Sequence, residues 1–374
     1  MSAAPPKTRT FRIGTTVVAG QGSVRLLGAQ LAGVDARRVV VVADRGVAEA
    51  GLLRRILDAA REIPVRATVL VDPDPDVRTA VQAAETARAA RCDTVLAVGG
   101  GSALCAAKAV AILLTNEGPL TAYEGVGRVP ARPAPCVAVP TTAGSGSEVS
   151  NALVLHEPGR DREIIVRGPG CEPAVAVLDG EVLRGLPRTP MLYAALDALT
   201  HALEALWAEG GNRITDALAA EAAEQITAVL PRALEDREDA ALQQLLEASC
   251  TANLACGNSG LGLVHALSAS PTVPLPHGYQ NGCLLLPVAH FNTPVMRPRH
   301  QSLVADVEEL FTRIGFPGRF APGELSASHA QAMVRAARNH PFRTNNRRVS
   351  TTRELYELLR AAGADTIATE EKTT

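Results

Sequence analysis

Residues 93–111 of the chain are DTVLAVGGGSALCAAKAVA, and this stretch decides the fold of the amino-terminal half. The apolar run Asp93–Val98 has the length of a buried strand, and the helix-forming residues from Ala103 onward predict a helix. The glycines between them predict a tight turn that leaves backbone N–H groups free at the start of that helix, where an anion is favoured. The three glycines Gly99–Gly101 lack the Gly-x-Gly-x-x-Gly spacing of dinucleotide-binding loops, so a simple strand-to-helix turn is the alternative.

The sequence on either side of this stretch repeats the alternation of strand and helix. Further strands are predicted at Arg38–Asp44, Val65–Val71, Pro135–Val139 and Ala174–Leu178, with helices at Val47–Ala60 and Val77–Ala90. Such alternation is typical of a parallel sheet with helices on both faces. From residue 180 onward the strand pattern disappears, and helices are predicted at Thr189–Ala208, Ile214–Leu234, Ala240–Cys256, Leu261–Ser268 and Arg353–Ala362. We therefore predict a Rossmann-like α/β domain over residues 1–180 and an all-helical domain over residues 181–374.

The composition excludes several classes of protein. Of the 374 residues, 47% are hydrophobic and 20% are charged, which allows a large core and excludes a disordered protein. A formal net charge of −2 and only 3% aromatic residues give no sign of binding to nucleic acid or to an anionic membrane. The sequence contains no apolar run near the roughly 18 residues that span a bilayer.

The cysteines and the amino terminus favour a cytoplasmic protein. The seven cysteines form no Cys-x-x-Cys pair, and an odd, scattered set is typical of reduced thiols. Lys7 and Arg9 are followed by no apolar segment, which differs from the pattern of a secretory signal. For the assembly, a homodimer is the default expectation.

Two further segments strengthen the prediction of a nucleotide site. Asp44 ends a predicted strand, where a carboxylate is placed to accept hydrogen bonds from a ribose diol and to repel a 2′-phosphate. Pro140–Glu148, with the sequence PTTAGSGSE, follows the predicted strand that ends at Val139. Hydroxyl groups and glycines at the carboxyl end of a strand lie where open α/β sheets bind ligands, although a solvated loop has the same composition.

The second half contains a stronger chemical pattern. Asp197 and His201 lie one turn apart on a predicted helix that is apolar almost all round, so both side chains share a buried face. His265 and His277 also have apolar neighbours. An internal Asp–His ion pair and satisfied core histidines are the alternatives. Three histidines and one carboxylate together favour a site for Zn²⁺ or Fe²⁺, and this donor set is poor for Mg²⁺ or Ca²⁺.

Four motifs resemble the iron-containing (group III) alcohol dehydrogenases over nearly the whole chain. They are GGGSALCAAKAVA (Gly99–Ala111), VPTTAGSGSEVS (Val139–Ser150), DALTHALEA (Asp197–Ala205) and GLGLVHAL with LPHGYQNG (within Gly260–Gly282). The second and third motifs are the most specific. The resemblance implies the dehydroquinate synthase-like fold of this family, with a dinucleotide domain, a helical metal domain and the active site in the cleft between them.

The resemblance also assigns roles to individual residues and to cofactors. It implies that Asp197, His201, His265 and His277 are the metal ligands and form the catalytic site, with Fe²⁺ as the metal and Zn²⁺ as the alternative. Asp44 would favour NAD over NADP. The implied cofactor contacts are Gly100, Gly101, Ser102, Thr141, Thr142, Ser145, Ser150 and Leu178. The implied reaction is hydride transfer between a small alcohol or aldehyde and the nicotinamide, with the metal polarising the substrate oxygen.

The chain departs from the family pattern at three places. Ala269 stands where family members usually carry a histidine associated with proton transfer, and Cys105 stands where the glycine-loop helix usually carries an aspartate. The segment from His265 to His277 is also about two residues shorter than the common pattern. These departures leave open a proton path through water, Tyr279 or His290.

Three other functions fit the same sequence. The fold also occurs in NAD-dependent hydroxyacid–oxoacid transhydrogenases and in lyases like dehydroquinate synthase, in which NAD is recycled within one turnover. A catalytically weakened paralogue that serves as a binding partner is the third, and it is supported by Ala269 and Cys105. The complete set of one aspartate and three histidines argues against it, because buried polar groups without a partner are costly.

Overall fold

The computed structural model describes residues 8–59, 62, 64–160 and 163–365. Its first half is built around a sheet whose strand order is β1-β9-β6-β4-β2-β3, and every neighbouring pair is parallel. The strands are β1 (Thr16–Ala19), β2 (Val39–Asp44), β3 (Val65–Val71), β4 (Thr94–Gly99), β6 (Cys136–Pro140) and β9 (Val175–Leu178). The predicted parallel sheet is confirmed. The short edge strand β1 was not predicted, because its four residues form no long apolar run.

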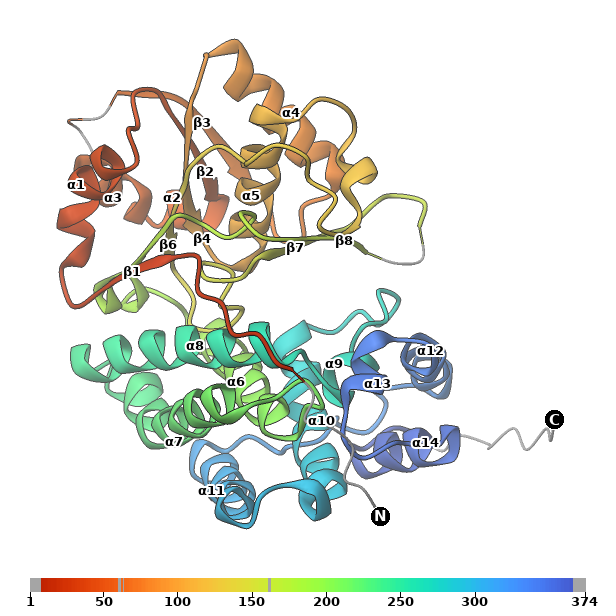
Figure 1. The fold of residues 1–374 in the computed structure, drawn as a ribbon. Coiled ribbons are helices and arrows are strands. Elements are labelled where there is room, and N and C mark those ends of the chain that lie inside the picture. Colours follow the sequence, from red (N-terminus) through yellow and green to blue (C-terminus); the bar gives the residue numbers. More distant parts are fainter. Residues whose placement is uncertain (1–7, 60–61, 63, 161–162, 366–374) are drawn as a thin grey trace.

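Helices cover both faces of this sheet (Figure 1). In β2 the side chains alternate, so that Val41 packs with α1 (Leu27–Gly33) and α3 (Leu52–Ala59) in one apolar cluster. Its neighbour Val42 packs with α4 (Val77–Ala89) and α5 (Gly101–Thr115) in the other cluster. Strands buried on both faces explain why the sequence shows continuous apolar runs rather than alternation.

The predicted helix Val47–Ala60 is two helices in the structure. The helix α2 (Arg45–Glu49) ends before Gly51, which has a φ of 72° and interrupts the helical geometry, and α3 starts at Leu52. Ala60 lies outside the described residues, as do Lys7 and the residues before it.

A second, small sheet was not predicted. It contains β5 (Gly125–Val126), β8 (Ile164–Arg167) and β7 (Ala152–Leu155) in that order, and β7 and β8 are antiparallel. Strands of two to four residues give too short a pattern to be identified from sequence. Strand β7 packs against α5 and extends the layer on that face of the main sheet.

After β9 the described residues form helices and no further sheet. The long helix α6 lies at the centre of this half and packs against α7, α8 and α10. Within the described residues, short 3₁₀ segments occur before β9 at Ser23–Leu26 and Leu120–Tyr123, and after it at Gly180–Leu183 and Thr293–Val295. The α-helices are α6 (Arg188–Trp207), α7 (Arg213–Glu235), α8 (Asp239–Ser259), α9 (Leu263–Leu267), α10 (His277–Asn292), α11 (Pro298–Ile314), α12 (Ala327–Arg338), α13 (Pro341–Asn345) and α14 (Thr352–Ala361).

The loop after β6 joins the two halves. A Cβ atom on Gly144 would lie 2.8 Å from the Cα atom of Ala194 in α6, so only glycine permits this close approach. On the side of α8, the Ser249 hydroxyl donates to the Gly144 carbonyl oxygen, and the Asn253 amide donates to the Ser145 carbonyl oxygen at 2.9 Å. The carboxyl end of β6 is therefore fixed against two helices of the second half.

The amino-terminal segment makes a second connection between the halves (Figure 1). The backbone N–H of Arg12 donates to the side chain of Asn258 in α8 at 2.7 Å, and Asn258 donates to the Arg12 carbonyl oxygen at 3.1 Å. Four residues later, the Thr16 backbone N–H donates to Ala174 at the edge of the main sheet. The segment thus contacts the helical half before it enters the sheet.

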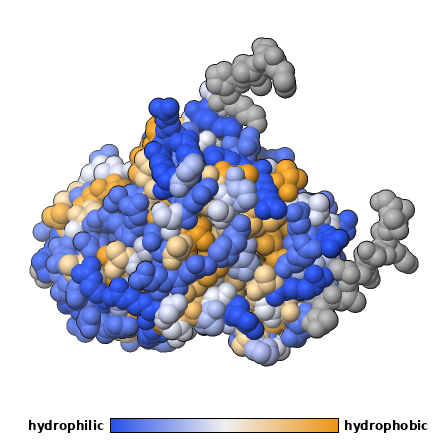
Figure 2. All heavy atoms as spheres, turned by 90° about the horizontal axis from the view of Figure 1, so that it is seen from below, coloured by the Kyte–Doolittle hydropathy of each residue, from blue (hydrophilic) through white to orange (hydrophobic). Residues whose placement is uncertain are grey.

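No helix within the described ranges is long and apolar enough to cross a membrane. The face viewed in Figure 2 is mostly hydrophilic, with hydrophobic residues in scattered groups. All seven cysteines are free thiols, as predicted.

Candidate metal and cofactor site

Three helices bring the four predicted metal ligands together. Asp197 and His201 lie one turn apart on α6, His265 lies in the short helix α9, and His277 is the first residue of α10. The Asp197 Oδ1 atom is 3.7, 3.5 and 3.6 Å from the Nε2 atoms of His201, His265 and His277. The structure thus clusters all four side chains around one carboxylate oxygen.

These distances fit a single divalent cation. Ligand atoms about 2.1 Å from a tetrahedral metal are about 3.4 Å apart, close to the separations observed here. Asp197, His201 and His265 are each less than 10% exposed, whereas the His277 side chain is 53% exposed. Candidate donor atoms of the first three all lie within 4.8 Å of one another. The donor set therefore suits Fe²⁺ or Zn²⁺.

Burial and mutual charge shift the pKa values of these groups. Burial alone would raise the pKa of Asp197, but the neighbouring histidines hold it well below the ordinary range. Burial lowers the pKa of His201 to about 4. Burial also opposes the charged form of His265, yet the carboxylates of Glu204 and Asp197 raise the pKa of His265 to about 9. The cluster therefore combines a stabilised carboxylate with imidazoles of unequal basicity.

Two residues in this cluster were not identified from the sequence. The Asn281 side chain is fully buried, and its amide nitrogen lies 2.8 Å from Asp197 Oδ1 and 3.0 Å from His277 Nε2. Glu204, also fully buried, contacts His265. The available signals were their spacings: Asn281 follows His277 by four residues on α10, and Glu204 follows His201 by three on α6.

The predicted cofactor residues gather at the carboxyl ends of neighbouring strands. Asp44 ends β2, and its Oδ2 atom accepts the backbone N–H of Gly100 after β4 at 2.6 Å. Burial raises the pKa of Asp44, and the hydrogen bond from Gly100 opposes that rise. A Cβ atom on Gly101 would lie 2.9 Å from Ser145, so the glycine loop and the loop after β6 are in close contact.

The start of α5 has the features of an anion site. Its N-cap residue is Gly100, which has no side chain to occupy the free backbone N–H groups. A Cβ atom on Gly100 would lie 3.2 Å from Thr142 Oγ1, and the backbone N–H of Thr141 donates to the Gly99 carbonyl oxygen. The predicted contact residues Gly100, Thr141 and Thr142 thus lie at the same turn.

The other predicted cofactor residues lie around this group. The Ser102 hydroxyl accepts the backbone N–H of Asp74. Leu178 ends β9, and its carbonyl oxygen accepts the side chain of Gln243 from α8. Ser150 lies further along the loop after β6, where its hydroxyl accepts the N–H of Ala152.

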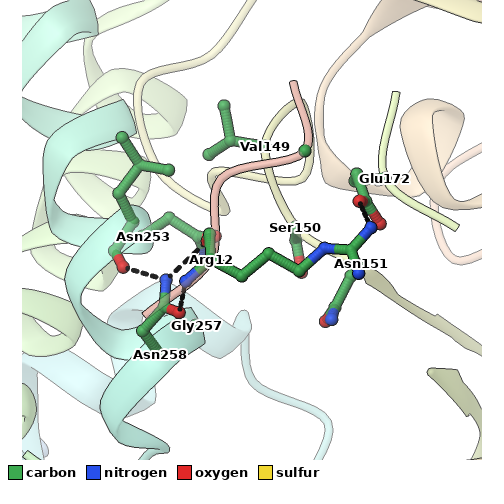
Figure 3. A pocket seen from close by; sticks show the side chains of 10 residues that line it. Arg12, Val149, Ser150, Asn151, Glu172, Asn253, Gly257 and Asn258 are labelled. Atoms are coloured by element: carbon green, nitrogen blue, oxygen red, sulfur yellow. Dashed lines mark hydrogen bonds and ion pairs between the residues drawn. The ribbon is translucent and has the colours of Figure 1, made fainter. Parts of the chain in front are cut away.

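Ser150 lines a small pocket at the junction of the two halves (Figure 3). In this view the Arg12 side chain extends toward Glu172, with which it forms an ion pair at 3.1 Å. Asn258 pairs with the Arg12 backbone on the opposite side. The remaining walls come from the loop at Val149–Asn151 and from Asn253, Leu254 and Gly257 of α8.

Lys108 fixes the loop that carries these hydroxyl groups. Its ammonium group is buried, and burial lowers the pKa of Lys108. It donates to the carbonyl oxygens of Ser147 at 3.0 Å, Ser150 at 3.3 Å and Ala152 at 2.5 Å. Cys105, one turn earlier on α5, contacts the Ser147 hydroxyl at 3.5 Å. The departure at Cys105 therefore lies against this loop.

The two candidate residues for proton transfer, Tyr279 and His290, bond to carboxylates outside the cluster of four side chains. The hydroxyl of Tyr279 donates to Glu324, and His290 forms an ion pair with Glu308 near the far end of α10. Neither has a hydrogen bond to the four clustered side chains in the described part of the chain. Ala269 offers no proton-transferring group, so a path through water is the alternative that these contacts favour.

The buried carboxyl group of Glu148 predicts a pH-dependent stability. Burial raises its pKa from 4.5 to about 7, so the folded protein keeps a proton that the unfolded chain releases. The free energy of unfolding should therefore fall as the pH rises from about 4.5 to 7, by up to about 3 kcal/mol. Urea unfolding across this range should show a flatter profile for Glu148→Gln than for the exposed control Glu85→Gln. Parallel profiles would contradict the prediction.

Family models match both halves of the chain. The model described as iron-containing alcohol dehydrogenase matches residues 14–180. The model of the carboxy-terminal region of the same family matches residues 191–363. Together the two models cover most of the chain, and they agree with the family resemblance that the four motifs indicated.

Individual relatives agree with the family models. The chain is 33% identical over 377 residues to the probable alcohol dehydrogenase EutG of Salmonella typhimurium, covering 96% of this chain and 95% of that protein. It is 27% identical to the NAD-dependent methanol dehydrogenase of Bacillus methanolicus, covering 94% and 99%.

Solved structures share the whole architecture. A 1,3-propanediol oxidoreductase has a TM-score of 0.88 at 25% identity, covering 95% of this chain and all of that one. The sulfoacetaldehyde reductase of Bifidobacterium kashiwanohense in complex with NAD⁺ has a TM-score of 0.88 at 26% identity, covering 96% and 99%. With the two family models and the clustered aspartate and histidines, these matches establish that the chain belongs to the iron-containing alcohol dehydrogenase family.

Proposed function

We propose that this chain is an NAD-dependent alcohol dehydrogenase or aldehyde reductase in which Asp197, His201, His265 and His277 hold one divalent cation. The observation that carries the proposal is the convergence of three imidazole nitrogens on Asp197 Oδ1 at 3.5–3.7 Å. The iron group is the family to which the chain belongs, which favours Fe²⁺, with Zn²⁺ as the alternative.

The residues of this chain have distinct tasks in that reaction. Gly100 and Gly101 allow a pyrophosphate to approach the start of α5, and Asp44 is placed to accept hydrogen bonds from the adenosine ribose. The four clustered ligands fix the position of the cation. When bound, the cation supplies a Lewis acid for the oxygen of the alcohol or aldehyde, and the nicotinamide exchanges a hydride with the carbinol carbon.

The named relatives support NAD and this reaction class. The methanol dehydrogenase is NAD-dependent by name, and the sulfoacetaldehyde reductase was solved with NAD⁺. The relatives reported above are named as dehydrogenases, a reductase and an oxidoreductase. This favours a dehydrogenase over the transhydrogenase, lyase and non-catalytic alternatives.

The organisation around the site is part of the same proposal. We assign residues 1–180 to the nucleotide domain and residues 181–374 to the metal domain. A homodimer is supported by the edge position of β1, because Val17 within this strand and Ile13 before it are exposed. Seven free thiols support a cytoplasmic location.

The first experiment is the metal content per chain of protein purified without oxygen, compared with His265→Ala. We expect about one Fe or Zn per chain in the natural protein and a large loss in the variant. The loaded protein should then oxidise NADH with a small aldehyde. Absence of metal from the natural protein, even after reconstitution, would overturn the proposal.

Asp44 should determine the choice between NAD and NADP. In Asp44→Asn the side-chain oxygen still accepts the N–H of Gly100, but the charge that repels a 2′-phosphate is gone. We expect the ratio of kcat/KM for NAD over NADP to fall by about tenfold or more, equivalent to about 1.4 kcal/mol. The exposed control Asp72→Asn should keep the natural ratio, and an unchanged ratio in Asp44→Asn would refute this role.

A further inference from the structure

Glu204 is a buried carboxylate that the ligand set does not account for. It is fully buried on α6, and it follows Asp197 and His201 by seven and three residues. Helical positions with this spacing share one face, so α6 presents both ligands and Glu204 in the same direction. A buried carboxylate needs strong partners, because losing its hydration costs several kcal/mol.

The partners of Glu204 all lie in or beside α9. Its Oε2 atom accepts the backbone N–H of Gly262 at 2.9 Å, and its Oε1 atom accepts that of Val264 at 2.6 Å. The N-cap of α9 is Gly262, which has no capping side chain of its own. Glu204 therefore supplies from α6 the cap that α9 lacks.

The same carboxylate also contacts a metal ligand directly. His265 Nδ1 donates to Glu204 Oε2 at 2.7 Å. With the proton held on Nδ1, the lone pair of His265 lies on Nε2, the atom that is 3.5 Å from Asp197 Oδ1. A carboxylate behind a metal-bound histidine fixes the ring and its tautomer and makes the ligand more basic.

Charge balance is a second reason for a carboxylate at this position. Asp197 and Glu204 are two buried carboxylates, and histidines that bind a metal do so as neutral imidazoles. A divalent cation at the cluster therefore has its charge matched by these two carboxylates. An amide at position 204 would leave one positive charge of the cation unmatched by the buried side chains described here.

We propose that Glu204 is a positioning residue of the metal site: it joins α6 to α9 and holds His265 with its Nε2 atom toward the cation. This inference rests on the proposed function, because it concerns the same site. It assigns a task to a residue outside the four ligands and predicts that Glu204 acts through His265.

The test measures the affinity of the full-length protein for Zn²⁺ alone, in competition with a coloured chelator at fixed pH. Glu204→Gln keeps the size of the side chain but loses the charge and one acceptor. We expect its affinity for Zn²⁺ to fall by about 10- to 100-fold. The matched control Glu224→Gln, on the exposed face of α7, should keep the natural affinity. Equal affinities of Glu204→Gln and the natural protein would overturn the proposal.

A double-mutant cycle with His265→Ala separates positioning from general destabilisation. If Glu204 acts mainly through His265, adding Glu204→Gln to His265→Ala should lower the remaining Zn²⁺ affinity by clearly less than it does in the natural background, because only the charge of Glu204 then still acts on the cation. A loss as large as in the natural background would overturn the proposal. The visible absorption of the Co²⁺-loaded protein adds a spectroscopic measure, because it should change in Glu204→Gln and stay the same in Glu224→Gln.

A second variant, Gly262→Ala, tests the proposal even if Glu204→Gln does not fold. A Cβ atom on Gly262 would lie 3.0 Å from Glu204 Oε1, so Gly262→Ala should push the carboxylate away while keeping its charge. We expect a smaller loss of Zn²⁺ affinity in the same direction, and unchanged affinity would count against the proposal. If the natural protein binds no Zn²⁺, the proposed function itself fails, which is a separate outcome.

Discussion

Asp197→Asn is expected to remove the bound metal and to lower kcat/KM for alcohol oxidation by about a thousandfold. Asp197 supplies the carboxylate among the four clustered side chains, and its Oδ1 atom is the one that all three histidines face. An amide of the same size keeps the packing of α6 but offers a neutral oxygen or a nitrogen that does not bind metals. Loss of a Lewis acid costs several kcal/mol of transition-state stabilisation, and about 4 kcal/mol corresponds to a thousandfold.

The matched control for this variant is Asp216→Asn. Asp216 is also a buried carboxylate on a helix, but it pairs with Arg297, the N-cap residue of α11, and has no contact with the ligand cluster in the described residues. The control should keep its metal even if its melting temperature falls. The metal content per chain and the steady-state kinetics of both variants provide the comparison. A fully loaded and active Asp197→Asn protein would refute the assignment of Asp197 as a ligand.

Gly278→Ala is expected to destabilise the protein by about 3 kcal/mol and to weaken metal binding. A Cβ atom at this position would lie 2.0 Å from the backbone carbonyl oxygen of Tyr193 in α6. A backbone atom cannot rotate away as a side chain can, so the start of α10 must move away from α6. His277 is the adjacent residue, and it would move with it, away from Asp197.

Gly33→Ala serves as the control for Gly278→Ala. Gly33 is the last residue of α1, and a Cβ atom there would meet no neighbour within 4 Å. We expect this variant to be neutral or more stable by up to about 1 kcal/mol. Denaturant unfolding and Zn²⁺ competition on both proteins provide the comparison. Equal stability of the two variants would show that the contact at Tyr193 does not limit the packing.

The sequence predicted those parts of the fold whose pattern is local. Strands such as β2 and β4 are buried on both faces, so each appears as one continuous apolar run. Strand β1 was missed because its partner β9 lies far along the chain, and the small sheet was missed because its strands of two to four residues give too short a pattern. Local propensity contains no information about such partners.

The sequence predicted only those residues of the candidate site whose side chains are unusual among their neighbours along the chain. Asp197 and His201 were conspicuous because charged and titratable groups are rare on an apolar helix. Glu204 lies on the same helix, but its task depends on α9, which packs beside it only in the folded protein. Asn281 was missed for the same reason.

The amino-terminal segment limits how the two halves can move. Arg12 is bonded to Asn258 in the helical half, and Thr16 is bonded to the edge of the main sheet. Four residues of extended chain span at most about 14 Å, so while both sets of bonds persist Asn258 and the edge of the main sheet cannot move far apart on this side. The loop after β6 fixes a second point between the halves, so any opening that keeps both connections is small. A larger opening would first have to break the hydrogen bonds between Arg12 and Asn258, and re-forming them would return the halves to the same alignment.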